Sequence, residues 1–160
     1  MKSTFGQSIT LTIAGESHGA ALTAIVAGLA PGLPVDEAYI AAQMEHRRAI
    51  GDISTARHEP DEVEILSGVF RGRTTGTPVT LLIRNRDTHS ADYAPLAAVP
   101  RPGHADYTAQ CKYHGFQDYR GGGHFSGRIT AAVVAAGALV LPALRDRGIA
   151  IATHIARSAR

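Results

Sequence analysis

Cysteine is almost absent from this sequence, and tryptophan is missing altogether. The single thiol, that of Cys111, excludes an internal disulfide and the cysteine-rich zinc modules, and it is typical of a reducing compartment. Aromatic residues make up only 6% of the 160 residues, and Lys and Arg together (16) exceed Asp and Glu (14) by two. Without a strong positive charge or a stripe of aromatic and basic residues, the sequence predicts no nucleic-acid partner.

The chain also lacks a long hydrophobic run. The longest apolar stretch, Ile129–Leu144, contains Pro142 and is shorter than the roughly 20 residues of a membrane span, so we expect a core helix and no membrane association. Residues 1–7 lack the apolar segment of a signal peptide, which makes the cytoplasm the expected location. A length of 160 residues fits a single domain.

Lysine is scarce as well. Only Lys2 and Lys112 are lysines, so 14 of the 16 cationic residues are arginine. A guanidinium group suits carboxylates and phosphates because it can donate two parallel hydrogen bonds to them. A GC-rich coding sequence produces the same bias, so this count indicates an anionic ligand only weakly.

The hydrophobic pattern indicates both strands and helices. Asp36 is a suitable N-cap for the first helix, whose Ile40 and Met44 lie on one face. The expected strands are 8–13, 22–29, 63–70, 79–84 and 149–156, and the expected helices are 36–48, 105–113 and one from 126 or 127 that ends at Gly148. This order predicts an α/β fold of the α+β type, with a mixed or antiparallel sheet. Between these elements, residues 85–127 hold four of the eight histidines in a long segment of the kind that is usually functional.

Two glycine-flanked histidines are candidates for proton transfer, because imidazole exchanges a proton near neutral pH. His18 lies in the turn Gly15-Glu16-Ser17-His18-Gly19, with an exposed, inactive turn histidine as the alternative. His104 follows two prolines and a glycine, and Asp106 is placed either to orient its imidazole or to cap the next helix. The pair His104 and Asp106 can also begin a metal site, although a third ligand at a recognisable spacing is missing.

Two further segments are suited to anions. The triple glycine Gly121–Gly123 enters a helix, where free N–H groups and the helix dipole favour a phosphate, with a flexible loop as the alternative. Arg128 and Ile129 stand where a Walker A motif requires Lys and Ser or Thr, so nucleotide triphosphate hydrolysis is disfavoured. Arg47 and Arg48, with Arg57, form a group that either grips an anion or complements the dipole at the end of a solvated helix.

Taken in order along the chain, these strings resemble chorismate synthase. The matching strings cover nearly the whole chain: Gly15-Glu16-Ser17-His18-Gly19, Arg47-Arg48, Glu59-Pro60-Asp61, Glu64-Ile65-Leu66-Ser67-Gly68, Thr74-Thr75-Gly76-Thr77-Pro78, Arg101-Pro102-Gly103-His104-Ala105-Asp106, Lys112-Tyr113, and Gly121-Gly122-Gly123 through Gly127-Arg128. Chains of that family are more than twice as long. The resemblance therefore implies that residues 1–160 are the N-terminal part of one chorismate synthase domain, a β-α-β sandwich whose complete form is a homotetramer.

The resemblance implies an anti 1,4-elimination of phosphate and a proton from 5-enolpyruvylshikimate 3-phosphate, which gives chorismate in the shikimate pathway. Reduced FMN is required although no net redox change occurs, and NADPH is a potential reductant. His18 matches the acid that assists the departing phosphate, and His104 matches the group that protonates or balances the reduced flavin. His124, Phe125, Ser126 and Arg48 match cofactor-binding positions, and Arg48, Arg57 and Arg128 are expected to bind the substrate.

After the triple glycine the commoner family sequence is Arg-Ser-Ser-Ala-Arg-Glu. This chain differs from it, with His124 and Phe125 in place of the first Arg and Ser. The acidic residue that the family assigns to flavin deprotonation lies in the C-terminal part. Two other readings stay open: a truncated, inactive remnant that binds flavin or an anion, and a metal-dependent hydrolase built on His104 and Asp106.

Overall fold

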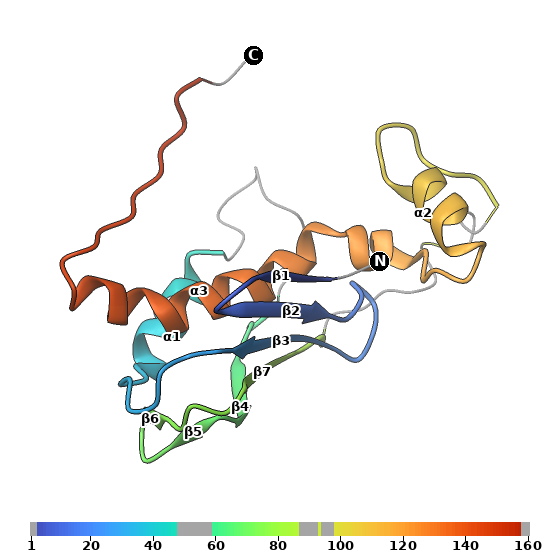
Figure 1. Ribbon diagram of the computed structural model, residues 1–160. Coiled ribbons are helices and arrows are strands. Elements are labelled where there is room, and N and C mark those ends of the chain that lie inside the picture. Colours follow the sequence, from blue (N-terminus) through green and yellow to red (C-terminus); the bar gives the residue numbers. More distant parts are fainter. Residues whose placement is uncertain (1–2, 48–58, 87–92, 94–97, 158–160) are drawn as a thin grey trace.

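The protein is an antiparallel sheet covered on one face by helices, as a computed structural model shows (Figure 1). The structure describes residues 3–47, 59–86, 93 and 98–157. The strands are β1 (Thr4–Gly6), β2 (Thr10–Ala14), β3 (Ala21–Ala27), β4 (Val63–Ser67), β5 (Val69–Phe70), β6 (Arg73–Thr74) and β7 (Val79–Arg84). The helices are α1 (Glu37–Glu45), α2 (Asp106–Tyr113) and α3 (Thr130–Arg145), with 3-10 turns η3 (Arg120–Phe125) and η4 (Gly127–Ile129) before α3.

Five strands form the main sheet in the order β1-β2-β3-β7-β4, and every pair is antiparallel. β4 and β7 pair as antiparallel neighbours, and a small ribbon of β5 and β6 lies in the connection between them. The strand predicted at 63–70 is divided at Gly68 into β4 and β5. β1 and β6 were not predicted, because strands of two or three residues are too short to show an alternating pattern. The α+β class is confirmed, with the antiparallel form of the sheet.

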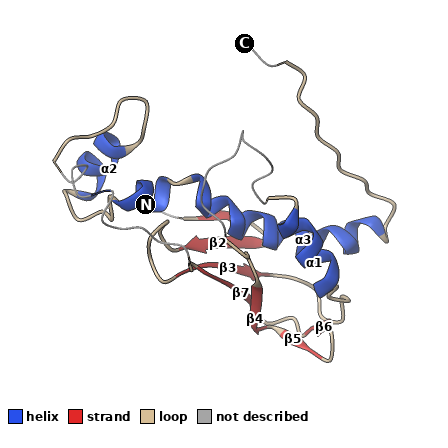
Figure 2. Cartoon of the chain, turned by 180° about the vertical axis from the view of Figure 1, so that it is seen from behind, coloured by secondary structure: helices blue, strands red, loops and turns tan. Residues whose placement is uncertain are grey.

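The core forms where β3 and β7 face α3. Alternate residues of the two strands pair across the sheet, Leu22 with Ile83 and Ala24 with Leu81, and all four are at most 1% exposed. Helix α3 presents small buried side chains to these strands: Ala131, Ala132, Ala135, Ala136 and Ala138. Small side chains let the helix axis approach the sheet closely, so the apolar run from Ile129 is a core element as expected. Figures 1 and 2 show α1 beside the C-terminal end of α3, and α2 near its beginning.

By length and composition alone, the apolar helical segment Gly127–Arg145 is also long enough to cross a membrane, with a mean hydropathy of 1.8. One such helix is weak evidence for a span, because the core helix of a soluble protein meets the same test. The contacts between α3 and strands β2, β3 and β7 favour the core interpretation.

The predicted ends of the elements have mixed outcomes. Asp36 caps α1 by accepting a hydrogen bond from the Tyr39 main-chain N–H at 2.8 Å, as expected. The predicted end of that helix at residue 48 is wrong, because α1 ends at Glu45 and residues 46–47 form a turn. The strand predicted at 149–156 is wrong. Its residues are exposed and run away from the sheet (Figure 1), and alternation of apolar residues makes a strand only where another strand is available to pair with it.

Candidate active site

His18 lies in the connection between β2 and β3. Its side chain is buried, with 9% of its surface exposed, so the alternative of an exposed turn histidine is wrong. The imidazole packs edge to face against Tyr93, with ring centroids 4.7 Å apart and an interplanar angle of 68°. A histidine held in this way has a fixed ring position, which proton transfer to a bound group requires.

His104 lies in the turn before α2 and is held by two charged neighbours. Its Nδ1 is 3.0 Å from Asp106 Oδ1 and 3.2 Å from Arg101 Nη2. Asp106 makes no capping hydrogen bond to α2, whose N-cap residue is Ala105, so of its two predicted roles the structure supports orientation of the imidazole. Both of its carboxylate oxygens also accept hydrogen bonds from Arg101, at 2.8 and 2.9 Å.

These contacts fix the charge beside His104. The Arg101 guanidinium, by hydrogen bonding, holds the pKa of the Asp106 carboxyl well below its usual range despite partial burial. The Arg101 guanidinium only donates, so its hydrogen bond makes Nδ1 of the neutral ring an acceptor and leaves the exchangeable proton on Nε2, on the other side of the ring. The geometry is therefore that of a histidine held by an arginine–carboxylate pair, with Nε2 left to take part in general acid–base chemistry.

The triple glycine packs against both histidines. Gly121, Gly122 and Gly123 all have positive φ (57°, 84° and 53°), a conformation that glycine adopts without steric cost. A Cβ atom added to Gly121 would lie 2.4 Å from His18 Cε1, and one added to Gly122 would lie 2.5 Å from His104 Cε1. Each imidazole thus occupies the space of a missing side chain, on adjacent residues.

The three residues after the triple glycine have separate contacts. His124 Nδ1 donates to the main-chain oxygen of Gly15 at 2.8 Å, and its Nε2 is 3.2 Å from Ser3 Oγ, so both ring nitrogens bond to protein. Phe125 is 36% exposed, and its ring lies 5.1 Å from Lys112 Nζ. Ser126 Oγ accepts a hydrogen bond from the Arg128 main-chain N–H at 3.2 Å. Their predicted role in flavin binding stays a prediction.

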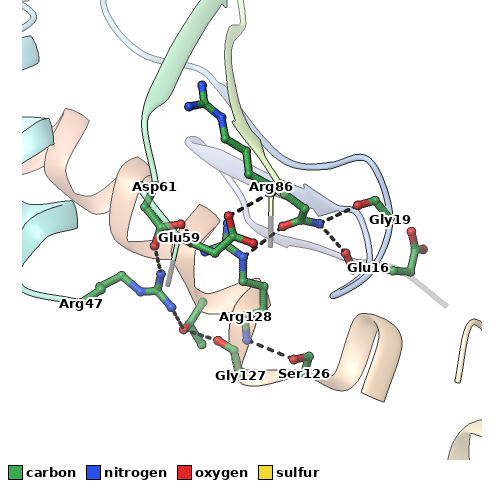
Figure 3. A network of polar contacts seen from close by, with 11 residues as sticks. Glu16, Gly19, Arg47, Glu59, Asp61, Arg86, Ser126, Gly127 and Arg128 are labelled. Carbon is green, nitrogen blue, oxygen red and sulfur yellow. Dashed lines mark hydrogen bonds and ion pairs between the residues drawn. The ribbon is translucent and has the colours of Figure 1, made fainter. Parts of the chain in front are cut away.

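Arg128 belongs to a buried polar network (Figure 3). Its side chain is 7% exposed, and its guanidinium bonds to Asp61 through Nη1 and to Asn85 Oδ1 through Nε at 3.0 Å. Asp61 also accepts from Arg47 Nη1 at 2.8 Å. Arg128 Nη2 lies 4.0 Å from Glu59 and makes no hydrogen bond within the part of the chain that the structure describes.

The remaining predicted residues have limited support. Arg48 and Arg57 lie outside the described residues, and Arg47 bonds to Asp61 and to Thr130 Oγ1. Within residues 3–47, 59–86, 93 and 98–157, no group of three or more His, Cys, Asp or Glu side chains is placed to hold a metal ion.

Sequence reasoning missed Arg101, Tyr93, Asp61 and Asn85 as parts of the site. Arg101 had a local signal, because it lies three residues before His104. Asp61 and Asn85 had none that a single sequence reveals, since they meet Arg128 only through the fold, at separations of 67 and 43 residues.

Comparisons with known proteins identify the family. The family model described as chorismate synthase matches residues 9–160. The chain belongs to the chorismate synthase family. It is 51% identical over 154 residues to the chorismate synthase of Aeropyrum pernix and 46% identical over 155 residues to that of Pyrococcus abyssi. The aligned regions cover 96% and 97% of this chain but 40% and 44% of those relatives, so the chain spans about two fifths of their length.

The fold has a counterpart among solved chorismate synthase structures. A crystal structure of chorismate synthase superposes with a TM-score of 0.62 and 32% sequence identity, and the match covers 89% of this chain and 36% of that one. The match supports the fold class as the N-terminal portion of the chorismate synthase fold, and the histidines described above lie within the residues that the family model matches.

Proposed function

We propose that the chain is the N-terminal part of a single chorismate synthase domain, and that the complete protein is a carbon–oxygen lyase of aromatic amino-acid biosynthesis in the cytoplasm, assembled as a homotetramer. Its substrate is 5-enolpyruvylshikimate 3-phosphate. The C–O bond to phosphate breaks, a proton leaves the ring on the opposite face, and the new double bond gives chorismate. The observation that carries this proposal is the placement of His18 and His104 against adjacent glycines in a chain of this family.

The charges around the histidines support their proposed roles. His18, buried and fixed by Tyr93, is suited to give a proton to the departing phosphate oxygen. His104, with Nδ1 facing the Asp106 carboxylate, holds its mobile proton at Nε2. Arg128 keeps one buried donor, Nη2, for an anion, and Arg48 and Arg57 are proposed to bind the substrate with it.

Two of the three residues after the triple glycine have groups that can contact a flavin. Phe125 offers a partly exposed ring and Ser126 retains its hydroxyl proton, whereas His124 uses both ring nitrogens within the protein. Phe125 and Ser126, with Arg48, would therefore hold reduced FMN, and His124 would act by fixing the Gly15 carbonyl. Reduced FMN, with NADPH as a potential reductant, would supply electron density to the substrate without net redox change.

The test is anaerobic phosphate release from 5-enolpyruvylshikimate 3-phosphate with chemically reduced FMN. It compares the 160-residue chain with a version extended to the family's length by the C-terminal part of the Aeropyrum pernix relative. We expect release by the extended protein, and a loss of about 10²-fold or more in its His18→Asn and His104→Asn variants. His114→Asn is the matched control, because His114 is exposed and asparagine tolerates its positive φ of 56°.

Each outcome is decisive. Equal release by His104→Asn and the unchanged protein removes His104 from the mechanism. Phosphate release by the 160-residue chain without the C-terminal extension shows that its site is complete. If both proteins are folded and bind FMN but release no phosphate, the chain is an inactive flavin-binding remnant and the proposed reaction is wrong.

A further inference from the structure

The turn that carries His18 is held by the side chain of a residue from a distant strand. Asn85 directly follows β7, and its Nδ2 donates to the main-chain oxygens of Glu16 at 3.0 Å and Gly19 at 2.8 Å. Its main-chain N–H also donates to the oxygen of Ala20 at 3.1 Å. Figure 3 shows Glu16 and Gly19 with these hydrogen bonds as dashed lines, and the two residues lie on either side of His18 in the sequence.

The orientation of the Asn85 amide is fixed by its other end. Its Oδ1 accepts from Arg128 Nε at 3.0 Å, and Arg128 is in turn bound to the buried carboxylate of Asp61. A guanidinium only donates and a carbonyl oxygen only accepts, so the amide has one arrangement that satisfies every partner. Both Nδ2 protons therefore face the His18 turn.

Other contacts complete the hold on this turn. The Ser17 main-chain N–H donates to the oxygen of Gly123 at 3.1 Å, and His124 Nδ1 donates to the oxygen of Gly15. The hydrogen bonds of Asn85, unlike these two, connect the His18 turn to the Arg128 network. Asn85 thus bonds to the residues on both sides of His18 in the turn.

We propose that Asn85 is a positioning residue for His18, and that it acts through its two Nδ2 donations rather than through support of the fold. This inference rests on the proposed function. The geometry separates the two roles, because the donors serve the His18 turn while the acceptor serves Arg128.

The Asn85→Asp variant tests whether the two Nδ2 donations position His18. Aspartate has the same shape and keeps an oxygen for Arg128, but it replaces both donors by an oxygen that repels the carbonyls of Glu16 and Gly19. In the extended protein we expect kcat for phosphate release to fall at least tenfold while KM changes less than threefold. Gln7→Glu is the matched control, because it makes the same amide-to-carboxylate change at an exposed residue in the turn between β1 and β2.

A second readout does not depend on activity. Hydrogen exchange of the Gly19 amide, which donates to the Glu16 oxygen at 3.2 Å, should be at least tenfold faster in Asn85→Asp, and the His18 ring resonances should shift. Both are measured by NMR in the 160-residue chain and in the extended protein, with melting temperature as the check on folding.

The outcomes distinguish this inference from the proposed function. Unchanged Gly19 exchange and unchanged His18 resonances in Asn85→Asp overturn the positioning role, whether or not phosphate is released. Altered resonances in a folded protein whose unchanged form releases no phosphate uphold the positioning role and refute the proposed reaction. If kcat falls in Asn85→Ala but not in Asn85→Asp, Asn85 acts through Arg128 and the inference is wrong.

Discussion

The contact between Gly122 and His104 allows a quantitative test. In Gly122→Ala, the added Cβ would lie 2.5 Å from His104 Cε1 and 3.1 Å from Nε2, whereas ordinary van der Waals contact begins near 3.4 Å. The imidazole must therefore move by about 1 Å, and a misplacement of that size in a reacting group costs about 10²-fold in rate. The substitution also places alanine at a φ of +84°, which destabilises the fold by about 1 kcal/mol.

Gly32→Ala separates these two effects. Gly32 has the same φ of +84°, but a Cβ there would meet nothing within 4 Å. We expect both variants to lose about 1 kcal/mol in urea unfolding from the backbone conformation, and only Gly122→Ala to lose phosphate release in the extended protein. Equal activity in the two variants would refute the claim that the triple glycine sets the position of His104.

Three further substitutions test the stability of the fold. Asp106→Asn should lower the free energy of unfolding by about 1–3 kcal/mol at pH 7. Because Arg101 lowers the folded-state pKa of Asp106, this stability is present above the unfolded pKa of about 3.9 and is lost as the pH falls through the lower folded value, so urea unfolding of the two proteins should converge in acid. Asp61→Ala should cost about 3–5 kcal/mol, since it leaves the buried Arg128 charge uncompensated, and a loss below 1 kcal/mol would contradict the network. Leu22→Ala, at a fully buried site, should cost about 2–5 kcal/mol, and a melting temperature close to that of the unchanged protein would contradict the packing.

The elements that could be predicted are those with a local cause. Strands β3 and β7 alternate buried and less buried side chains, because one face of each packs against α3. Asp36 marks the start of α1 because its side chain satisfies an N–H of the first turn. Alternation of apolar residues gave a wrong prediction at 149–156, because no strand among the described residues lies beside this segment to pair with it.

The site was predictable only where its residues are close in sequence. The pairing of His104 with Asp106 follows from a spacing of two residues on a rigid turn. Arg128 contacts Asp61 and Asn85 because the fold brings together three segments that are far apart in the chain. No sequence motif beside Asp61 or Asn85 indicates these contacts. A tertiary network of this kind leaves no periodic signal.

The triple glycine shows why a motif can be recognised before its physical role is understood. Its composition indicates a loop that a phosphate can approach, yet the space beside Gly121 and Gly122 is filled by His18 and His104. The two imidazoles pack on adjacent residues of one turn, whose Cα atoms are about 3.8 Å apart. The glycines therefore set the spacing of the two proposed proton donors, and a side chain at either position displaces one histidine relative to the other.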